Sequence, residues 1–560
     1  MTESLDDAVD QLHLLDRYKV VTNKVWEDIW INELEAQFID TMEFQRLHWV
    51  LQLGTAMFVY PDANHTRFEH ALGTMEATQR IVSACVENHR RYATLPIGSY
   101  AQLLARVGGL LHDLAQMPYA HTLDLRGEGH LFETEWKNKK LRESLLGPNG
   151  FVDRAVREFF KNRSKGAEQQ ATNLSKNLIP DLDWILSKPQ TEDSTSENHE
   201  LEAPPPDKHY LCYVRDIIGN TLCADLFDYV QRDILSVGFQ DRVSLRPLQF
   251  FCIKEFRGFP RLALALFKPK NPEKMREDVI FEAIEFLRKR YSLAERVYFH
   301  HAKMAASAMI IKAVDSAGLK CEEVWSFGDH ALLLHLQSLK GNEGNRVSAT
   351  IANLLLRRDL FKLAYELRHR VEYAPGETVD EAKENYAKGV NCRENQRALE
   401  ETLTQALGIG PESLAVYSPD PKMNLKAFEA LVWPKGSKDL MPLKDLGDAK
   451  PESEELMRKH QRLWRLAVFI KRDLYDKPGF LERVQRLCKA LVEGQRTDID
   501  TLAESYAESH KEDFSGGGVS WDNRDKVVAI VRQAIIAKER GGFSFPEVKA
   551  VLTELKNQKP

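Results

Sequence analysis

Apolar residues recur at three- and four-residue spacing along most of the chain, and this spacing predicts helices. Strand-like alternation of apolar and polar residues is confined to a few short runs. The pattern therefore predicts a mostly α fold. The expected helices cover residues 44–53, 70–89, 101–115, 222–234, 301–318 and 347–370.

One polar stretch, residues 162–208, interrupts this pattern. It contains few aromatic residues and has three consecutive prolines near its end. Such a composition buries little apolar surface, so we expect an insertion or a surface loop here. Within it, residues 178–186 are expected to form a short helix.

The chain has 560 residues, more than one compact core usually holds, so we expect two or more lobes. We place a core in residues 1–345 and a C-terminal lobe in residues 346–560. Hydrophobic residues make up 43% and charged residues 29%, as in globular proteins. The formal net charge of -6 gives no general attraction for nucleic acid or anionic lipid, so we expect neither as a partner.

Three features of the sequence predict a cytoplasmic protein. The seven cysteines are scattered and none form a CxxC pair, which favours a reducing compartment. The first twenty residues are acidic and lack the apolar segment of a secretory signal. No run of about 18 apolar residues occurs, so we expect no membrane span.

The candidate chemistry begins at the pair His112-Asp113. On the order of one such pair is expected by chance, given the 17 histidines of the chain, so the pair alone means little. Its context includes His70 upstream and Asp225 downstream. Two imidazoles and two carboxylates can form one mixed nitrogen and oxygen site, which suits Mn, Fe, Co, Ni or Zn. A metal of this kind polarises a phosphoryl oxygen and lowers the pKa of bound water, and both effects favour phosphoester hydrolysis.

The segment 222–234 gives an independent indication. As a helix it carries five polar residues on one face: Asp225, Asp228, Tyr229, Arg232 and Asp233. The alternative is a solvated helix face with a salt bridge between Asp228 and Arg232.

These segments resemble the HD-domain deoxynucleoside triphosphate (dNTP) triphosphohydrolases, a family with vertebrate and bacterial members. The similarity runs in the expected order through residues 38–73, 109–124, 224–233 and 290–301, and more weakly through 357–366. The resemblance implies an HD-domain helical core with an additional C-terminal α+β lobe. We expect no SAM domain, because the similar segments begin near the start of the sequence.

The resemblance also implies roles for individual residues. The metal ligands would be His70, His112, Asp113 and Asp225. His121 would stand near the scissile phosphate and be oriented by Asp124, and His130 would be a catalytic histidine. Because His130 is closer to His121 than the family pattern has it, a loop histidine is the equal alternative.

The substrate contacts implied by the resemblance fall into three groups. The sugar would contact Gln52 and Asp233 through its 3′-hydroxyl and Tyr229 at C2′. The base edge would contact Leu53, and the phosphates would contact Arg67 and Arg290. Tyr298 and His300 would lie around the base and the phosphates. For Arg290 the alternative is an exposed charge, and for Tyr298 it is helix packing.

The sequence departs from the family pattern at several positions. Gln116 stands where a second histidine is usual, and Leu226 stands where a lysine often follows the fourth metal ligand. We therefore expect weaker triphosphate binding, partly offset by Mg on the substrate phosphates. Asp40 and Gln45 match positions of the family's nucleotide activator site, but His48 replaces an arginine. The resemblance also implies a homo-oligomer.

Three functions remain open from the sequence. The first is hydrolysis of dNTPs to deoxynucleoside and triphosphate. The second is hydrolysis of another nucleotide or phosphoester, which the departures at Gln116 and Leu226 favour. The third is a weakly catalytic protein that senses nucleotides, against which the complete ligand set argues. A nuclease is disfavoured because the acidic balance provides no basic track for a strand.

Overall fold

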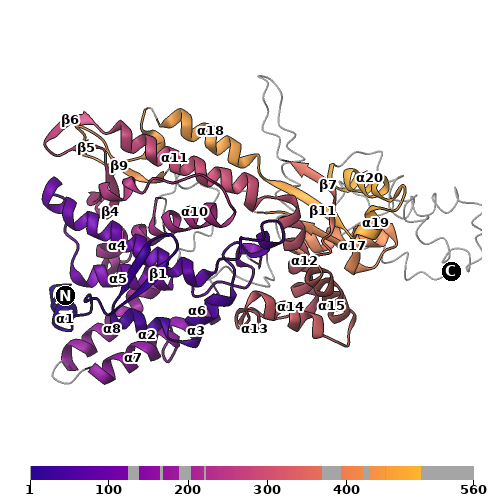
Figure 1. Ribbon diagram of the computed structural model, residues 1–560, viewed down its shortest axis with the longest axis horizontal. Coiled ribbons are helices and arrows are strands. Elements are labelled where there is room, and N and C mark those ends of the chain that lie inside the picture. Colours follow the sequence, from indigo (N-terminus) through magenta and orange to yellow (C-terminus); the bar gives the residue numbers. More distant parts are fainter. Residues whose placement is uncertain are drawn as a thin grey trace, which may run out of the picture.

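The computed structural model describes residues 2–123, 136, 138–163, 168–187, 204–219, 222–368, 393–419, 429–447 and 449–493. The fold is mostly helical, which confirms the predicted class (Figure 1).

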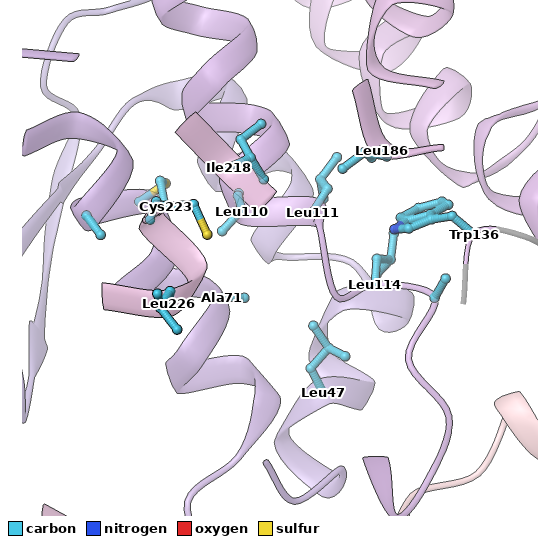
Figure 2. Close-up of a cluster of buried hydrophobic side chains, with 14 of the residues drawn as sticks. Leu47, Ala71, Leu110, Leu111, Leu114, Trp136, Leu186, Ile218, Cys223 and Leu226 are labelled. Carbon is cyan, nitrogen blue, oxygen red and sulfur yellow. The ribbon is translucent and has the colours of Figure 1, made fainter. Parts of the chain in front are cut away.

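The centre of the core is formed by α4 (Arg67–Tyr92), which packs against both α5 (Ser99–Leu111) and α10 (Ala224–Ser236). The first turn of α4 is closed by Glu69, whose carboxylate accepts the backbone amide of Thr66 at 3.3 Å. Apolar side chains from these helices fill the space between them, and Figure 2 shows Leu226 of α10 in the same cluster as Ala71 of α4. The predicted helices at 70–89 and 222–234 are thereby confirmed.

Further helices surround this centre. On the N-terminal side they are α1 (Thr2–Gln11), α2 (Glu33–Ile39), α3 (Met42–Gln45), α6 (Lys139–Leu146), α7 (Phe151–Arg163), α8 (Glu168–Leu186) and α9 (Cys212–Gly219). Later in the chain they are α11 (Glu277–Leu293), α12 (His301–Ala317), α13 (Cys321–Trp325), α14 (Asp329–Ser338), α15 (Glu343–Leu356) and α18 (Lys450–Gln461).

The strands form small sheets. β1 (Lys19–Asn23) pairs with β2 (Glu27–Ile31), and β5 (Phe267–Lys268) pairs with β6 (Asn271–Met275). A four-stranded sheet has the order β10-β9-β4-β3, formed by β3 (Phe251–Phe256), β4 (Phe259–Ala265), β9 (Leu431–Trp433) and β10 (Met441–Pro442). Beyond the expected boundary at 345/346 the chain returns to the core. There β9 pairs in parallel with β4, and α18 packs on α11.

The C-terminal α+β lobe lies at one end of the long axis (Figure 1). Its antiparallel sheet has the order β7-β11-β8, from β7 (Lys362–Arg368), β11 (Arg465–Ile470) and β8 (Leu414–Tyr417). Its helices are α17 (Arg393–Leu407), α19 (Arg472–Tyr475) and α20 (Phe480–Glu493). A second hydrophobic cluster fills this lobe.

Two predicted helices are wrong in part. The segment 347–370 is helical only to Leu356, and its later residues form β7, because Leu363, Ala364 and Tyr365 pack in a sheet. The segment 44–53 is helical only in the end of α3 and in the short 3-10 turn η1 (Arg46–Trp49), and a second 3-10 turn, η2 (Gly54–Phe58), begins after it.

The expected loop at 162–208 is also wrong in part. Residues 168–186 form α8, which packs against α1, α5 and α7. Its buried positions are spaced three and four residues apart among polar ones: Ala171, Leu174, Leu178, Leu182 and Ile185. Residues 188–203 lie outside the described part of the chain, and 206–211 form a 3-10 turn, η5 (Pro206–Leu211).

Among the helices that the structure describes, none combines the length and apolar character needed to cross a membrane.

The placement of α8 in the core generates a stability prediction. Leu182 is fully buried, so Leu182→Ala should lower the free energy of unfolding by about 2–5 kcal/mol. Lys176→Ala on the exposed face of the same helix should change it by less than about 0.5 kcal/mol. Urea unfolding measures both, and equal effects would contradict a core role for α8.

Candidate metal centre and nucleotide site

The predicted metal ligands come from three places in the core and meet at one point. His70 lies in the first turn of α4, His112 and Asp113 directly follow α5, and Asp225 lies in the first turn of α10. The Nε2 atoms of His70 and His112 are 3.2 Å apart. Asp225 Oδ1 lies 3.1 Å from His70 Nε2 and 3.7 Å from His112 Nε2.

Asp113 joins the same cluster but has a second partner. Its Oδ2 lies 3.5 Å from His70 Nε2 and 3.6 Å from His112 Nε2. The same oxygen accepts a hydrogen bond of 2.6 Å from Arg67 Nη1. The donor atoms of His70, His112 and Asp225 all lie within 4.8 Å of one another, so these three form the tightest part of the cluster.

The spacing of these atoms fits a transition metal. Ligands about 2.1 Å from one ion lie about 3.0–3.4 Å apart in tetrahedral or octahedral geometry. The observed separations of 3.1–3.7 Å are close to this range. The mixed nitrogen and oxygen donors also match the ions expected from the sequence.

A layer of buried hydrogen bonds orients His70. Its Nδ1 lies 2.7 Å from Asp228 Oδ2, which leaves Nε2 directed at the cluster. Asp228 also accepts two bonds of 2.8 Å from Arg232 and one of 2.6 Å from Trp26 Nε1. A Cβ on Gly73 would lie 1.8 Å from Asp228 Oδ1, so only glycine permits this approach of α10 to α4.

The polar face of α10 therefore points inward. The salt bridge between Asp228 and Arg232 that the alternative interpretation expected does form. However, its side chains are only 0% and 2% exposed, so the face is not solvated. The bridge instead holds the carboxylate that orients His70.

The cluster favours positive charge. Burial alone would lower the pKa of His70, but hydrogen bonds to Asp225 and Asp228 outweigh it and raise the pKa to about 9. The charges of Asp113 and Asp225 likewise outweigh burial and raise the pKa of His112. The two carboxylates placed against the two imidazoles suit a divalent cation.

The cluster opens to solvent on one side. The exposed fraction of the side chains rises from 0% at His70 through 13% at His112 to 34% at Asp225. A substrate would therefore approach past Asp225, at the start of α10.

Two of the three residues predicted to contact the sugar, Tyr229 and Asp233, lie further along α10. Asp233 Oδ2 accepts a bond of 2.6 Å from the hydroxyl of Tyr298, which ends the π-helical turn η7 (Ala294–Tyr298). Asp233 Oδ1 lies 2.8 Å from His65 Nε2. Gln52 is buried, and its Oε1 has no hydrogen-bond partner within the described residues. Such an oxygen is suited to accept a bond from a ligand.

The other predicted contacts are engaged within the protein. Tyr229, one turn after Asp225, accepts a bond of 2.7 Å from Arg290 Nε, which fixes its ring. Arg67 pairs with Asp113, so it contacts the cluster itself. His300 caps α12, where its Nδ1 accepts the amide of Ala302 at 3.2 Å. Leu53 is buried in the main hydrophobic core.

The predicted catalytic residues are only partly described. His121 is exposed, in the 3-10 turn η3 (Ala120–Leu123). Asp124 and His130 lie outside the described residues. The predicted roles of all three remain predictions.

The two departures from the family pattern are both buried. Leu226 packs in the hydrophobic core near Ala71 and Cys223 (Figure 2), so a lysine at this position would place its stem in the core. Gln116 is fully buried, and in the described part of the chain neither atom of its amide has a partner.

The residues that match an activator site also have partners inside the protein. Asp40 lies 3.5 Å from Lys19 Nζ, and Gln45 Nε2 donates to the carbonyl of Ile39 at 2.9 Å. The ring of His48 stacks on Phe68 with centroids 3.6 Å apart.

Two residues of the site were not identified from the sequence. His65 and Trp26 contact Asp233 and Asp228 across more than 160 positions of sequence. His65 carried a weak signal, because it lies five residues before His70. Trp26 carried none, since its spacing to Asp228 has no periodic meaning.

A separate cavity of about 220 Å³ lies between α12 and α17. Its charged side chains pair with one another: Arg393 and Lys312 contact Glu400, and Arg397 contacts Asp315. These ion pairs join α12 to α17 and form part of the contact between the lobes.

Comparison with known proteins indicates what the chain is similar to. Residues 275–486 match the family model described as the HD associated region. The human deoxynucleoside triphosphate triphosphohydrolase SAMHD1 is 26% identical over 319 residues, which are 54% of this chain and 45% of that protein. The zebrafish (Danio rerio) protein of the same name is 24% identical over 410 residues, 72% of this chain and 59% of its own.

The chain is a homologue of these HD-domain triphosphohydrolases. An uncharacterized protein of Methanocaldococcus jannaschii is also 28% identical over 327 residues, 57% of this chain and 55% of its own. The chain spans about half the length of the curated relatives it matches. Arg290 and Tyr298, which contact Tyr229 and Asp233, lie within the HD associated region.

The role of Asp228 can be tested by metal binding. Asp228→Asn should lower metal affinity by about 10–100-fold, because a residue that orients a ligand contributes about that much. Asp216→Asn weakens another buried ion pair, with Arg261, and should leave metal affinity unchanged. Metal titration of the folded variants measures both, and an unchanged affinity in Asp228→Asn would contradict the orienting role.

Proposed function

We propose that this chain is a metal-dependent phosphohydrolase that converts dNTPs to deoxynucleoside and triphosphate. The observation that carries the proposal is the convergence of two imidazoles and two carboxylates at the start of α10, with Tyr229 and Asp233 further along the same helix. The homology to triphosphohydrolases supports the same reaction.

In this proposal His70, His112, Asp113 and Asp225 hold a divalent transition metal. When bound, the ion would polarise a phosphoryl oxygen and lower the pKa of water. Arg67 stays bonded to Asp113 and fixes that carboxylate in place. His121 is exposed in η3, after the pair His112-Asp113. In this proposal it donates a proton to the leaving oxygen, as an imidazole can.

Sugar selection is assigned to α10 and its partners. The carboxylate of Asp233 accepts a hydrogen bond from the 3′-hydroxyl, and the amide nitrogen of Gln52 donates one to the oxygen of that hydroxyl. Tyr229 lies one turn beyond Asp225, and its ring, held by Arg290, fills the space at C2′. A ribose hydroxyl would then have no room.

A second function has one observation in its favour. Leu226 is buried in the core, and Gln116 offers a neutral amide, so two positions that could bind phosphate carry no charge. A substrate with fewer phosphates, or another phosphoester, would need less compensating charge.

The deciding experiment is a substrate screen of the metal-loaded protein. All dNTPs, the ribonucleotides, the monophosphates and a model phosphoester are compared, with products separated to distinguish triphosphate from single phosphate. We expect triphosphate and deoxynucleoside from dNTPs.

Asp225→Ala should lose both activity and most bound metal, because it removes one of the closest donors. Full metal occupancy in Asp225→Ala would show that the ligand assignment is wrong, and activity confined to monophosphates would favour the second function.

The sugar assignment gives a separate prediction. Tyr229→Ala should raise the rate on ribonucleotides relative to dNTPs by at least about tenfold, because it empties the space at C2′. Tyr229→Phe keeps the ring and should retain the preference for deoxyribose. Steady-state rates on matched dNTP and ribonucleotide pairs measure this, and equal preferences in all three proteins would contradict it.

A further inference from the structure

Asp329 is a buried carboxylate that the reaction outlined above does not use. It is the first residue of α14, in the HD associated region and more than 200 positions after the segment of His112 and His121. Its exposed fraction is 4%. Burial raises the pKa of its carboxyl to about 7, so the fold keeps an acid where ionisation is disfavoured.

The two oxygens of Asp329 join two segments of the candidate site. Oδ2 accepts the backbone amide of Leu51 at 3.1 Å, and Oδ1 accepts the backbone amide of Tyr119 at 2.7 Å. Leu51 directly precedes Gln52, and Tyr119 lies two residues before His121. The hydroxyl of Tyr119 returns a bond of 2.9 Å to the carbonyl of Asp329.

Both joined segments need to be held. Tyr119 and Ala120 have φ values of 61° and 53°, a left-handed conformation that residues with side chains rarely adopt. Gly54 has a φ of 50°, and a Cβ there would lie 2.5 Å from the carbonyl oxygen of Tyr119. The two segments therefore touch through their backbones, and Tyr119 and Ala120 hold a conformation that they would not readily keep without outside contacts.

The turn before Asp329 is itself fixed on both sides. Arg46 donates to the carbonyl of Phe327 at 3.2 Å and to that of Gln116 at 2.8 Å. Trp325 donates to the carbonyl of Leu114 at 3.1 Å. These hydrogen bonds hold the turn before Asp329 against the loop that leads from His112-Asp113 to His121.

We propose that Asp329 is a positioning residue that fixes the place of His121 relative to Gln52 in the proposed sugar site. It touches neither substrate nor metal and acts by fixing the backbone on both sides. The HD associated region would thereby control the geometry of the catalytic loop. This inference rests on the proposed function, because it assigns His121 to proton donation.

The test is a double-mutant cycle. Asp329→Asn replaces one acceptor oxygen with a donor, so it breaks one of the two clamping bonds. We expect kcat to fall by about 10–100-fold with KM changed less than about threefold and metal content unchanged. In a His121→Ala background the same substitution should cost less than about threefold, because its effect passes through His121.

Asp153→Asn is the matched control. Asp153 is equally buried and accepts a backbone amide, that of Asn149 at 2.8 Å, but lies on α7 away from the site. It should leave kcat unchanged. An Asp329→Asn enzyme with normal kcat, or with the same loss in both backgrounds, would overturn the positioning role.

A second readout does not need activity. Hydrogen exchange at the amides of Leu51 and Tyr119 should be at least about tenfold faster in Asp329→Asn than in Asp153→Asn. If the parent hydrolyses no phosphoester, the proposed function fails, and unchanged exchange would overturn the clamp separately. If Asp329→Asn does not fold, Tyr119→Phe removes only the returned bond and should show the same effects at smaller size. An unaltered Tyr119→Phe protein would then overturn the proposal.

Discussion

The site depends on one buried carboxylate, Asp228. A charged group without solvent is costly unless it is paired and hydrogen-bonded. Asp228 meets that condition through Trp26, His70 and Arg232, with every bond between 2.6 and 2.8 Å. These partners come from the loop before β2, from α4 and from α10 itself, so the same carboxylate joins three parts of the core. Its position is possible only because Gly73 has no side chain.

From this carboxylate the rest of the site follows in two directions along α10. One turn earlier, Asp225 meets the imidazoles of His70 and His112. Five residues later, Asp233 meets His65 and Tyr298. A single helix therefore places the His-Asp cluster and the proposed sugar contacts at a fixed separation. Because Asp225 and Asp233 lie on the same helix as Asp228, the bonds that fix Asp228 also fix the positions of these two residues.

Much of this could be predicted from the sequence, but only where local spacing carried the information. The helical spacing from Asp225 to Asp233 predicted the inward face of α10, and the pair His112-Asp113 pointed to the cluster. Composition misled at 168–186, where polar residues hid the buried positions of α8. The segment at 362–368 has apolar residues that fit a helix or a strand equally, and only pairing with β11 decides it. The contacts of Trp26 and Asp329 could not be predicted, because they join residues more than 200 positions apart.

The return of the chain to the core in β9 has a consequence for synthesis on the ribosome. β4 is complete at Ala265, but its parallel neighbour ends at Trp433, about 170 residues later. At about 5–20 residues per second, the edge of β4 stays open for roughly 8–34 seconds while those residues are made. An open edge in a growing chain can pair with other chains. The nascent protein therefore carries this open edge through the middle of its synthesis, after the helices that contain His70 and Asp225 have been made.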